Sequence, residues 1–308
     1  MTVIVPTGAD NPLGGARVTG MPKASTNGVE LEYETFGDPA AEPLLLIMGL
    51  GTQMTAWPDP FCGMIADAGY HVIRFDNRDS GLSTMVDAPV PDFGQLLGGD
   101  LSGVPYRMSD LASDAAGLLD VLDIPAAHVV GASMGGMIGQ QMAIDHPRRV
   151  RSLCSIMSTT GARDVGQPAP EVLMLVFAPA AKTREEAIDR GQKMFETIGS
   201  PAYPTPTEAL RTRIGEAYDR SYAPAGTARQ LACIIASPDR TAALGSVTVP
   251  AAVVHGEADK LVDVSGGYAT AAALGVTPLI IAGAGHDLPE ELWETYVGAI
   301  VENARRAA

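Results

Sequence analysis

A serine inside a glycine-rich turn is the feature of this sequence that most directly indicates chemistry. Ser133 lies in Gly131-Ala132-Ser133-Met134-Gly135, a match to Gly-x-Ser-x-Gly, between a short apolar run and an expected helix. Such a turn holds the hydroxyl where a base and a substrate both reach it. Flanking glycines let the strand and the helix pass close together. The pattern predicts that Ser133 is a nucleophile, and an ordinary glycine-rich turn is the alternative interpretation.

A serine nucleophile needs a histidine as its general base, and the histidine needs a carboxylate that fixes its tautomer. Among the five histidines, His286 lies in the glycine-rich loop Gly283-Ala-Gly-His-Asp287, after the last expected strand. Such a loop can return the ring over the carboxyl edge of a sheet, so we expect His286 to be the base. The remaining histidines open or end expected elements and are interpreted as structural: His71, His128, His146 and His255.

Asp259 is the expected carboxylate partner of this histidine. It follows the penultimate expected strand, in His255-Gly-Glu-Ala-Asp259. A turn aspartate is the alternative interpretation of Asp259, and other acids remain candidates for the role: Asp164, Glu257 and Asp263. Asp287 is adjacent to the base and is expected to point elsewhere.

Two backbone amides are expected to bind the oxyanion that forms when a serine attacks a carbonyl. The N–H of Met134 lies at a helix start and is free to point at an anion. The second is expected from Gly49-Leu50-Gly51, which follows the apolar run 43–48. Glycines there let the backbone turn inward, so Leu50 N–H is the predicted donor. Each such donor is worth roughly 2.7–4 kcal/mol.

Apolar runs and amphipathic segments alternate over much of the chain, which predicts a parallel sheet with right-handed crossovers. Strands are expected at 29–34, 43–48, 71–76, around Val129, and at 150–157, 249–255 and 278–282. Helices are expected at about 56–68, at 109–122, after Ser133, and at about 290–305. The prediction is an α/β fold with a mostly parallel central sheet flanked by helices.

The alternation stops between about residues 160 and 244, where only helical stretches are expected. These are 171–177, 184–198, 207–222 and 227–235. We therefore expect a core of residues 26–160 and 245–308, a helical cap of residues 161–244, and an N-terminal arm of residues 1–25.

Two segments are candidates for a pocket wall. Several apolar cap residues are expected in the core, with a minority facing a pocket, where thioethers adapt to apolar ligands: Met174, Leu175, Met194, Leu231, Ile234 and Ile235. Residues 77–108 form a long connection rich in Gly, Pro and Asp. Its apolar members either cover part of a pocket or belong to a surface loop: Leu96, Leu97, Leu101 and Val104.

Composition narrows the classes of partner. A net charge of −15 and a pI near 4.6 argue against binding to nucleic acid or to an anionic membrane surface. No apolar stretch of about 18 residues appears, so no membrane span is expected. The N-terminus lacks the pattern of a signal peptide. Three widely spaced cysteines are typical of buried thiols in a reducing compartment, and the expected location is the cytoplasm.

The chain resembles α/β-hydrolases from end to end, apart from the N-terminal arm. The order Ser133, Asp259, His286 is the one such enzymes use. Five segments carry the resemblance: Leu46-Ile-Met-Gly-Leu-Gly51, Asp76-Asn-Arg-Asp-Ser-Gly-Leu-Ser83, Val130-Gly-Ala-Ser-Met-Gly-Gly136, His255-Gly-Glu-Ala-Asp259 and Gly285-His286.

Asn77-Arg78-Asp79 and Gly49-Leu50-Gly51 are similar to the versions in actinobacterial carboxylesterases, including mycobacterial lipase/esterase-type proteins and the aclacinomycin methylesterase branch. Met48 stands where many such enzymes carry a histidine, a departure that leaves the backbone donor in place. The resemblance implies that the segment Asp76-Asn-Arg78 supports the oxyanion loop, so that Arg78 is structural and not catalytic.

The resemblance also implies a reaction. It is the hydrolysis of small to medium lipophilic carboxylic esters through an acyl-enzyme, with no cofactor and no metal. The apolar residues expected near the site, including Leu50 and Met134, predict an uncharged, fairly lipophilic acyl or alcohol part. A monomer or homodimer is expected. A serine at position 133 argues against dehalogenase or epoxide hydrolase chemistry, which uses an aspartate there. Other uses of the same three residues remain open: perhydrolase or haloperoxidase-like activity, lactone hydrolysis, carbon–carbon bond hydrolysis, and ligand sensing with slow turnover.

Overall fold

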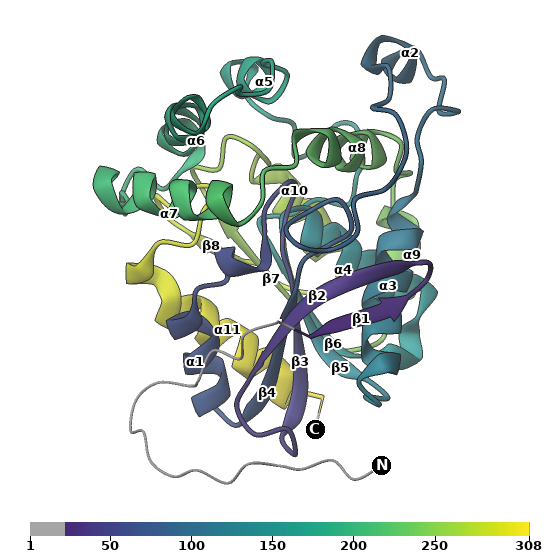
Figure 1. Ribbon diagram of the computed structural model, residues 1–308. Helices are drawn as coiled ribbons and strands as arrows, with labels where there is room; N and C mark the ends of the chain where they lie inside the picture. The colour runs from purple at the N-terminus through teal and green to yellow at the C-terminus, as the bar shows by residue number, and fades with distance from the viewer. Residues whose placement is uncertain (1–21, 308) are drawn as a thin grey trace, which may run out of the picture.

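A central sheet organises the computed structural model, which describes residues 22–307 (Figure 1). Within these residues eight strands lie in the order β1-β2-β4-β3-β5-β6-β7-β8. β1 pairs antiparallel with β2 and β2 antiparallel with β4, and every later pair is parallel. The expected mostly parallel sheet is therefore confirmed. The strands are β1 (Lys23–Thr26), β2 (Val29–Phe36), β3 (Glu42–Ile47), β4 (Tyr70–Phe75), β5 (Ala127–Ala132), β6 (Val150–Ile156), β7 (Ala251–Gly256) and β8 (Leu279–Ile281).

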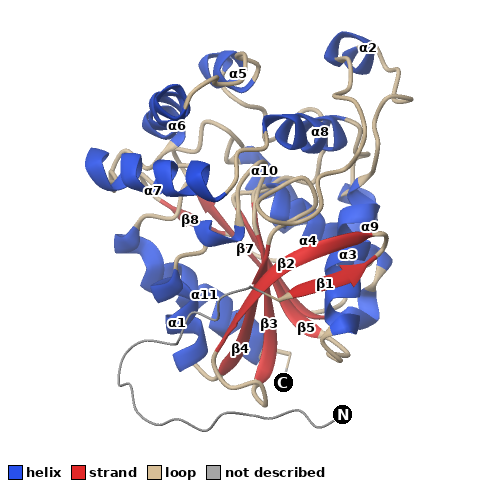
Figure 2. Cartoon of the chain, in the orientation of Figure 1, coloured by secondary structure: helices blue, strands red, loops and turns tan. Residues whose placement is uncertain are grey.

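Helices cover both faces of this sheet (Figure 2). α1 (Asp59–Asp67) and α11 (Trp293–Arg305) pack together on one face. The other face carries α3 (Met108–Val121), α4 (Met134–Asp145), α9 (Thr241–Leu244) and α10 (Ser265–Leu274). Single 3₁₀ turns lie at η1 (Met54–Ala56), η2 (Pro147–Arg149) and η3 (Glu290–Leu292).

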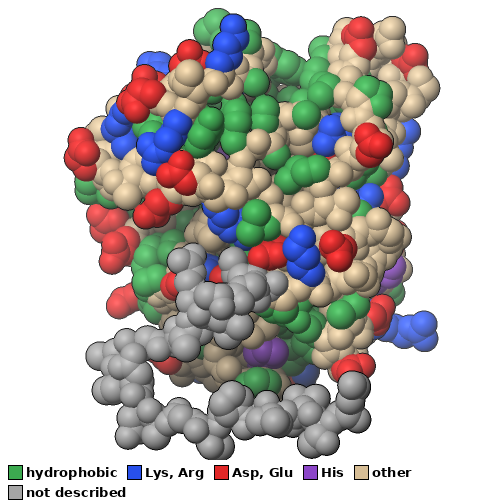
Figure 3. Space-filling view, in the orientation of Figure 1, with side chains coloured by type: hydrophobic (Ala, Val, Ile, Leu, Met, Phe, Trp, Pro, Cys, Tyr) green, Lys and Arg blue, Asp and Glu red, His purple; other side chains and the backbone are tan. Residues whose placement is uncertain are grey.

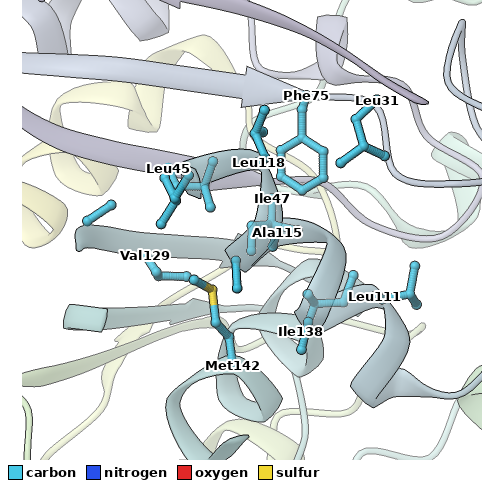
Figure 4. Close-up of a cluster of buried hydrophobic side chains, with 14 of the residues drawn as sticks. Leu31, Leu45, Ile47, Phe75, Leu111, Ala115, Leu118, Val129, Ile138 and Met142 are labelled. Atoms are coloured by element: carbon cyan, nitrogen blue, oxygen red, sulfur yellow. The ribbon is translucent and has the colours of Figure 1, made fainter. Parts of the chain in front are cut away.

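Consecutive residues of β3 show why its sequence is a continuous apolar run. Leu45 and Ile47 pack with α3 and α4 in one hydrophobic cluster (Figure 4), whereas Leu44 and Leu46 pack with α1 and α11 in a second. All four side chains are fully buried. A strand covered by helices on both faces has no solvent side, so it shows no alternation of apolar and polar residues.

Four helices between β6 and β7 lie over the edge of the sheet at which the parallel strands end (Figure 1). They are α5 (Pro170–Val176), α6 (Arg184–Ile198), α7 (Thr207–Arg220) and α8 (Pro224–Ile235). The helical stretches expected from the sequence are observed here, with shifts at their ends. α8 begins at Pro224 because proline is well tolerated in the first turn of a helix.

Some elements differ from the expectations. β1 begins at Lys23, within the segment expected as an arm, and residues 1–21 of that arm lie outside the described residues. α1 starts at Asp59, after Pro58, and not near residue 56. The short helix α2 (Phe93–Leu97) interrupts the connection 77–108. None of the described helices has the length and apolar character needed to cross a bilayer.

Candidate active site

Ser133 occupies the sharp turn between β5 and α4. Its backbone has φ 57° and ψ −122°, a positive-φ conformation that costs a non-glycine residue about 1–3 kcal/mol. The turn is held by two hydrogen bonds. The Ser133 amide donates to the carbonyl of Ile156 (2.9 Å), and the Ser158 hydroxyl donates to the carbonyl of Ser133 (2.8 Å). The strained backbone is thus fixed by the neighbouring strand β6 and by Ser158, two residues after it.

Two glycines of the motif are required by close backbone packing. A Cβ at Gly131 would lie 2.0 Å from the carbonyl oxygen of Gly135. A Cβ at Gly135 would lie 2.0 Å from the carbonyl oxygen of Ile47, at the end of β3. Any larger residue would push α4 away from the sheet, so the glycines set the geometry in which Ser133 is held.

His286 and Asp259 form a hydrogen-bonded pair at the same edge of the sheet. His286 Nδ1 lies 2.7 Å from Asp259 Oδ2, and both side chains are buried. Asp259 follows β7, and His286 follows β8, where its amide donates to the carbonyl of Ile198 in α6 (2.6 Å). The His286 ring and Ser133 line one cavity. The structure therefore pairs His286 with Asp259 and places Ser133 on the wall of the same cavity as His286.

The surroundings of Asp259 favour its ionised form. Its Oδ1 accepts hydrogen bonds from the amides of Leu261 and Val262, both at 2.9 Å. His255 Nε2 lies 3.4 Å from Oδ2 and 2.8 Å from the carbonyl of Val262. Burial by itself raises the pKa of Asp259, but the charge of His286 and hydrogen bonds from the two histidines lower it to about 2. Asp259 thus presents a fixed negative charge to His286.

The loop after β3 passes directly beside Ser133. A Cβ at Gly49 would lie 3.0 Å from the Ser133 Cβ and 3.4 Å from its Oγ. Within residues 22–307 the next amide, of Leu50, donates to no protein acceptor. The Met134 amide opens α4, in the turn where helix N–H groups lack partners inside the helix. Two amides with no acceptor in the described protein therefore flank the serine.

Buried polar residues after β4 hold this loop. The carboxylate of Asp76, fully buried, accepts the amides of Met54 (2.7 Å) and Leu82 (2.9 Å). Asn77 Nδ2 donates to the carbonyl of Met48 (2.9 Å). The expected support of the loop is therefore provided by Asp76 and Asn77.

The side chain of Arg78, the next residue, bonds to helix α3 and not to this loop. Its guanidinium forms a two-pronged ion pair with Asp114 of α3, with both nitrogen–oxygen distances 2.6 Å. The guanidinium also lies over the ring of Tyr106, 5.2 Å from its centroid. Arg78 thus anchors the segment after β4 to α3.

The cap helix α8 reaches into the same network, which the sequence analysis did not anticipate. Arg229 pairs with the buried Asp79 at 2.9 and 2.5 Å. Gln230 accepts the Gly51 amide (2.7 Å) and donates to the carbonyl of Arg78 (2.7 Å). No local pattern marks these residues, because their partners lie about 150 or more positions away in the chain.

A cavity of about 1630 Å³ lies between the sheet edge and the cap. Apolar side chains gather over the cap helices on the face seen in Figure 3. Three of the candidate cap residues line the cavity, namely Leu175, Met194 and Leu231. Residues 77–108 contribute Leu82 and Phe93. The four apolar residues named from that segment do not line it, so their role as a pocket cover is wrong: Leu96, Leu97, Leu101 and Val104.

Other candidates lie elsewhere or have other partners. His128 bonds Ser152 at the opposite end of the sheet, and the His146 ring contacts Ser113. Asp287 lines the cavity, and its Oδ1 accepts the Ser200 hydroxyl (2.5 Å). The alternative acids form no hydrogen bond or ion pair with His286: Asp164, Glu257 and Asp263. Within residues 22–307 no group of three or more His, Cys, Asp or Glu side chains is placed to hold a metal ion.

Comparisons with known proteins agree with this architecture. A rhodomycin D methylesterase of Streptomyces sp. (strain C5) is 34% identical over 207 residues, which are 60% of this chain and 64% of that protein. The corresponding Streptomyces peucetius enzyme is 33% identical over 206 residues, with the same coverage. The match thus spans less than two thirds of these relatives.

A solved structure and a family model extend the likeness over most of the chain. The enol-lactonase of Burkholderia xenovorans LB400 superposes with a TM-score of 0.73 at 22% identity and covers 92% of this chain and 100% of that one. The family model described as alpha/beta hydrolase fold matches residues 42–291, the span that contains Leu50, Ser133, Asp259 and His286. With its sheet order, its strained serine turn and this match, the chain belongs to the α/β-hydrolase family.

Proposed function

We propose that this protein hydrolyses carboxylic esters through an acyl-enzyme on Ser133. One observation carries the proposal: a serine in a strained strand-to-helix turn shares a cavity with a histidine held by a buried carboxylate at 2.7 Å. Ser133 is then the nucleophile, His286 the general base and Asp259 its orienting partner. The similarity to two rhodomycin D methylesterases supports an ester as the substrate.

In the proposed reaction, Ser133 Oγ attacks the ester carbonyl while His286 Nε2 takes the hydroxyl proton. The amides of Leu50 and Met134 donate hydrogen bonds to the oxyanion of the tetrahedral intermediate. The intermediate collapses to the acyl-enzyme, and His286 returns the proton to the leaving alcohol. Water then attacks the acyl-enzyme with His286 again as base, which releases the acid and restores Ser133.

The cavity supports a bulky, lipophilic acyl part. Pockets for drug-sized ligands measure about 300–1,000 Å³, and this cavity of about 1630 Å³ is larger. We therefore extend the expected small to medium substrates to larger ones. The names of the two Streptomyces relatives support a methyl ester, in which methanol leaves.

All five residues proposed to act in catalysis come from one chain, so a monomer or homodimer suffices. The three buried free cysteines support a reducing compartment such as the cytoplasm.

Ester hydrolysis tests the proposal directly. p-Nitrophenyl esters from acetate to palmitate are compared for the wild type, Ser133→Ala and the control Ser113→Ala. Ser113 lies on α3 and contacts the ring of His146, outside the cavity. We expect Ser133→Ala to abolish hydrolysis and to abolish labelling by a fluorophosphonate, with Ser113→Ala active. Wild-type rates no higher than those of Ser133→Ala would contradict the proposal and favour peracid formation, lactone or diketone cleavage, or ligand sensing.

A further inference from the structure

Arg213, on the cap helix α7, differs from the other arginines in the cavity wall. Among the described residues it makes no hydrogen bond and no ion pair within 4.0 Å. The other three arginines of the cavity wall form ion pairs or hydrogen bonds. Arg74 pairs with Glu34 and Asp59, and Arg220 pairs with Asp76. Arg190 donates to backbone carbonyls such as that of Ala178 (2.7 Å).

The guanidinium of Arg213 is fixed by an aromatic ring. Its Cζ lies 5.2 Å from the ring centroid of Phe195, on α6. Burial lowers the pKa of Arg213, and the charge of Asp287 acts in the opposite direction. A guanidinium carries five N–H donors in a planar fork, and Arg213 is half-buried on the cavity wall. The donors of Arg213 thus face a cavity that can supply an acceptor.

Arg213 and the proposed base are both in contact with helix α6. Phe195 lies one helical turn before Ile198, whose carbonyl accepts the His286 amide at 2.6 Å. Asp287, the next residue after His286, lines the same cavity, and its carboxyl accepts the Ser200 hydroxyl. Asp287 remains beyond ion-pair distance of Arg213.

We propose that Arg213 binds a carboxylate of the substrate, so that the preferred ester carries a second, anionic group apart from the ester bond. This inference rests on the proposed function, and it replaces the uncharged substrate expected from the sequence with an anionic one. The planar fork matches a planar carboxylate with two parallel hydrogen bonds. Asp287 on the same wall repels a dianion more strongly than a monoanion, which favours a carboxylate over a phosphate monoester. In a chain of net charge −15, this local cation determines whether an anionic substrate is accepted.

The test compares matched substrates and matched variants. The substrates are monomethyl esters of adipic, suberic and sebacic acids, and the same esters with the free carboxylate replaced by a carboxamide. The variants are Arg213→Met, Arg213→Lys and the control Arg211→Met. Arg211 lies on the same helix, pairs with Asp189 at 2.8 Å and does not line the cavity.

We expect the wild type to favour the carboxylate over the carboxamide by about tenfold or more in kcat/KM, mainly through KM. Arg213→Met should lose this preference and keep its rate on the carboxamide, Arg213→Lys should retain part of it, and Arg211→Met should match the wild type. Acetate esters of ω-hydroxy acids place the carboxylate on the alcohol side. A preference there, lost in Arg213→Met, supports the same site and assigns the anion to the leaving group.

Three results would overturn the inference: no wild-type preference in either series, equal slowing of both substrates by Arg213→Met, or the same loss in Arg211→Met. A binding measurement keeps the two proposals separate. Calorimetry with monomethyl suberate is done on Ser133→Ala and on Ser133→Ala/Arg213→Met. Binding that is lost only in the double variant supports the carboxylate site even if no ester is hydrolysed. Equal binding by both variants contradicts it.

Discussion

Gln230 of the cap accepts a hydrogen bond from the amide of Gly51, with its Oε1 2.7 Å from the nitrogen. The peptide unit that carries this amide also contains the Leu50 carbonyl, so the bond fixes the orientation of the loop that bears the Leu50 N–H. Gln230 is fully buried and does not line the cavity. A cap residue that does not touch substrate thereby positions a proposed oxyanion donor.

Gln230→Leu should therefore lower kcat by about tenfold or more with little change in KM, because a misplaced donor weakens transition-state binding. The control is Gln140→Leu. Gln140 is also fully buried, contacts Ser155 and Arg240, and lies outside the cavity wall. Steady-state kinetics and urea unfolding of both variants check the prediction. An equal fall in kcat in the control would show that loss of stability alone explains the effect.

Asp259→Asn should reduce kcat by about 10⁴-fold, because an amide favours the wrong tautomer of His286 and does not stabilise its charged form. Active-site titration with a fluorophosphonate normalises the rates to intact enzyme. A loss below about tenfold would assign the orienting role to another acid.

The depressed pKa of Asp259 also predicts an acid dependence of stability. A carboxylate whose pKa falls on folding stabilises the protein fully above its unfolded value, about 3.9, and this stabilisation is lost as the pH falls toward the folded value of about 2. The contribution is of the order of 2 kcal/mol. In urea unfolding, the difference between wild type and Asp259→Asn should shrink as the pH falls from 4 to 2. A difference independent of pH in that range would refute this origin.

Gly135→Ala should destabilise the fold by about 3 kcal/mol or more and remove activity, because the new Cβ would lie 2.0 Å from the Ile47 carbonyl oxygen. Gly63→Ala is the matched control. Gly63 lies inside α1, and a Cβ there would meet no atom within 4 Å. This control should gain about 0.5–1 kcal/mol from helix propensity. Thermal unfolding of both variants separates backbone contact from a general effect of replacing glycine.

Arg229→Met should cost about 3–5 kcal/mol, because it leaves the carboxylate of Asp79 buried without its cation. The double variant Asp79→Asn/Arg229→Met removes both charges and should regain part of that loss. Denaturant unfolding measures the three free energies. A double variant no more stable than Arg229→Met would mean that the uncompensated charge is not the cause.

How much of this structure the sequence predicts depends on how far apart in the chain the interacting residues lie. The turn at Ser133 was predictable because two glycines and a serine within five residues determine its geometry. The apolar run of β3 and the periodic apolar residues of α3 likewise predicted elements that the structure contains. For Asp259 and His286, the parallel strand order brings loop residues that are far apart in sequence to one edge.

The contacts of the cap were not predictable in this way. The pairs of Arg229 with Asp79 and of Gln230 with Gly51 join residues 150 and 179 positions apart, and neither residue is unusual for an exposed helix. The helix α10 was also missed. Its first turn contains Gly266 and Gly267, which approach Thr159 and His255 closely. Glycine has a low helix propensity, so these two residues, which are needed for tertiary packing, weaken the helical pattern of the sequence there.

The bonds from α8 to the loops of the core limit which segments of this protein can be exchanged with those of a relative. A chimera that exchanges residues between β6 and β7 with a relative's segment removes Arg229 and Gln230 together with the pocket wall. It leaves Asp79 without a counterion and Gly51 without an acceptor. Crossovers placed between α6 and α7 retain both contacts and also the pair of Arg220 with the buried Asp76. Specificity is thus most safely diversified in α5 and α6, with α7 and α8 inherited as part of the core.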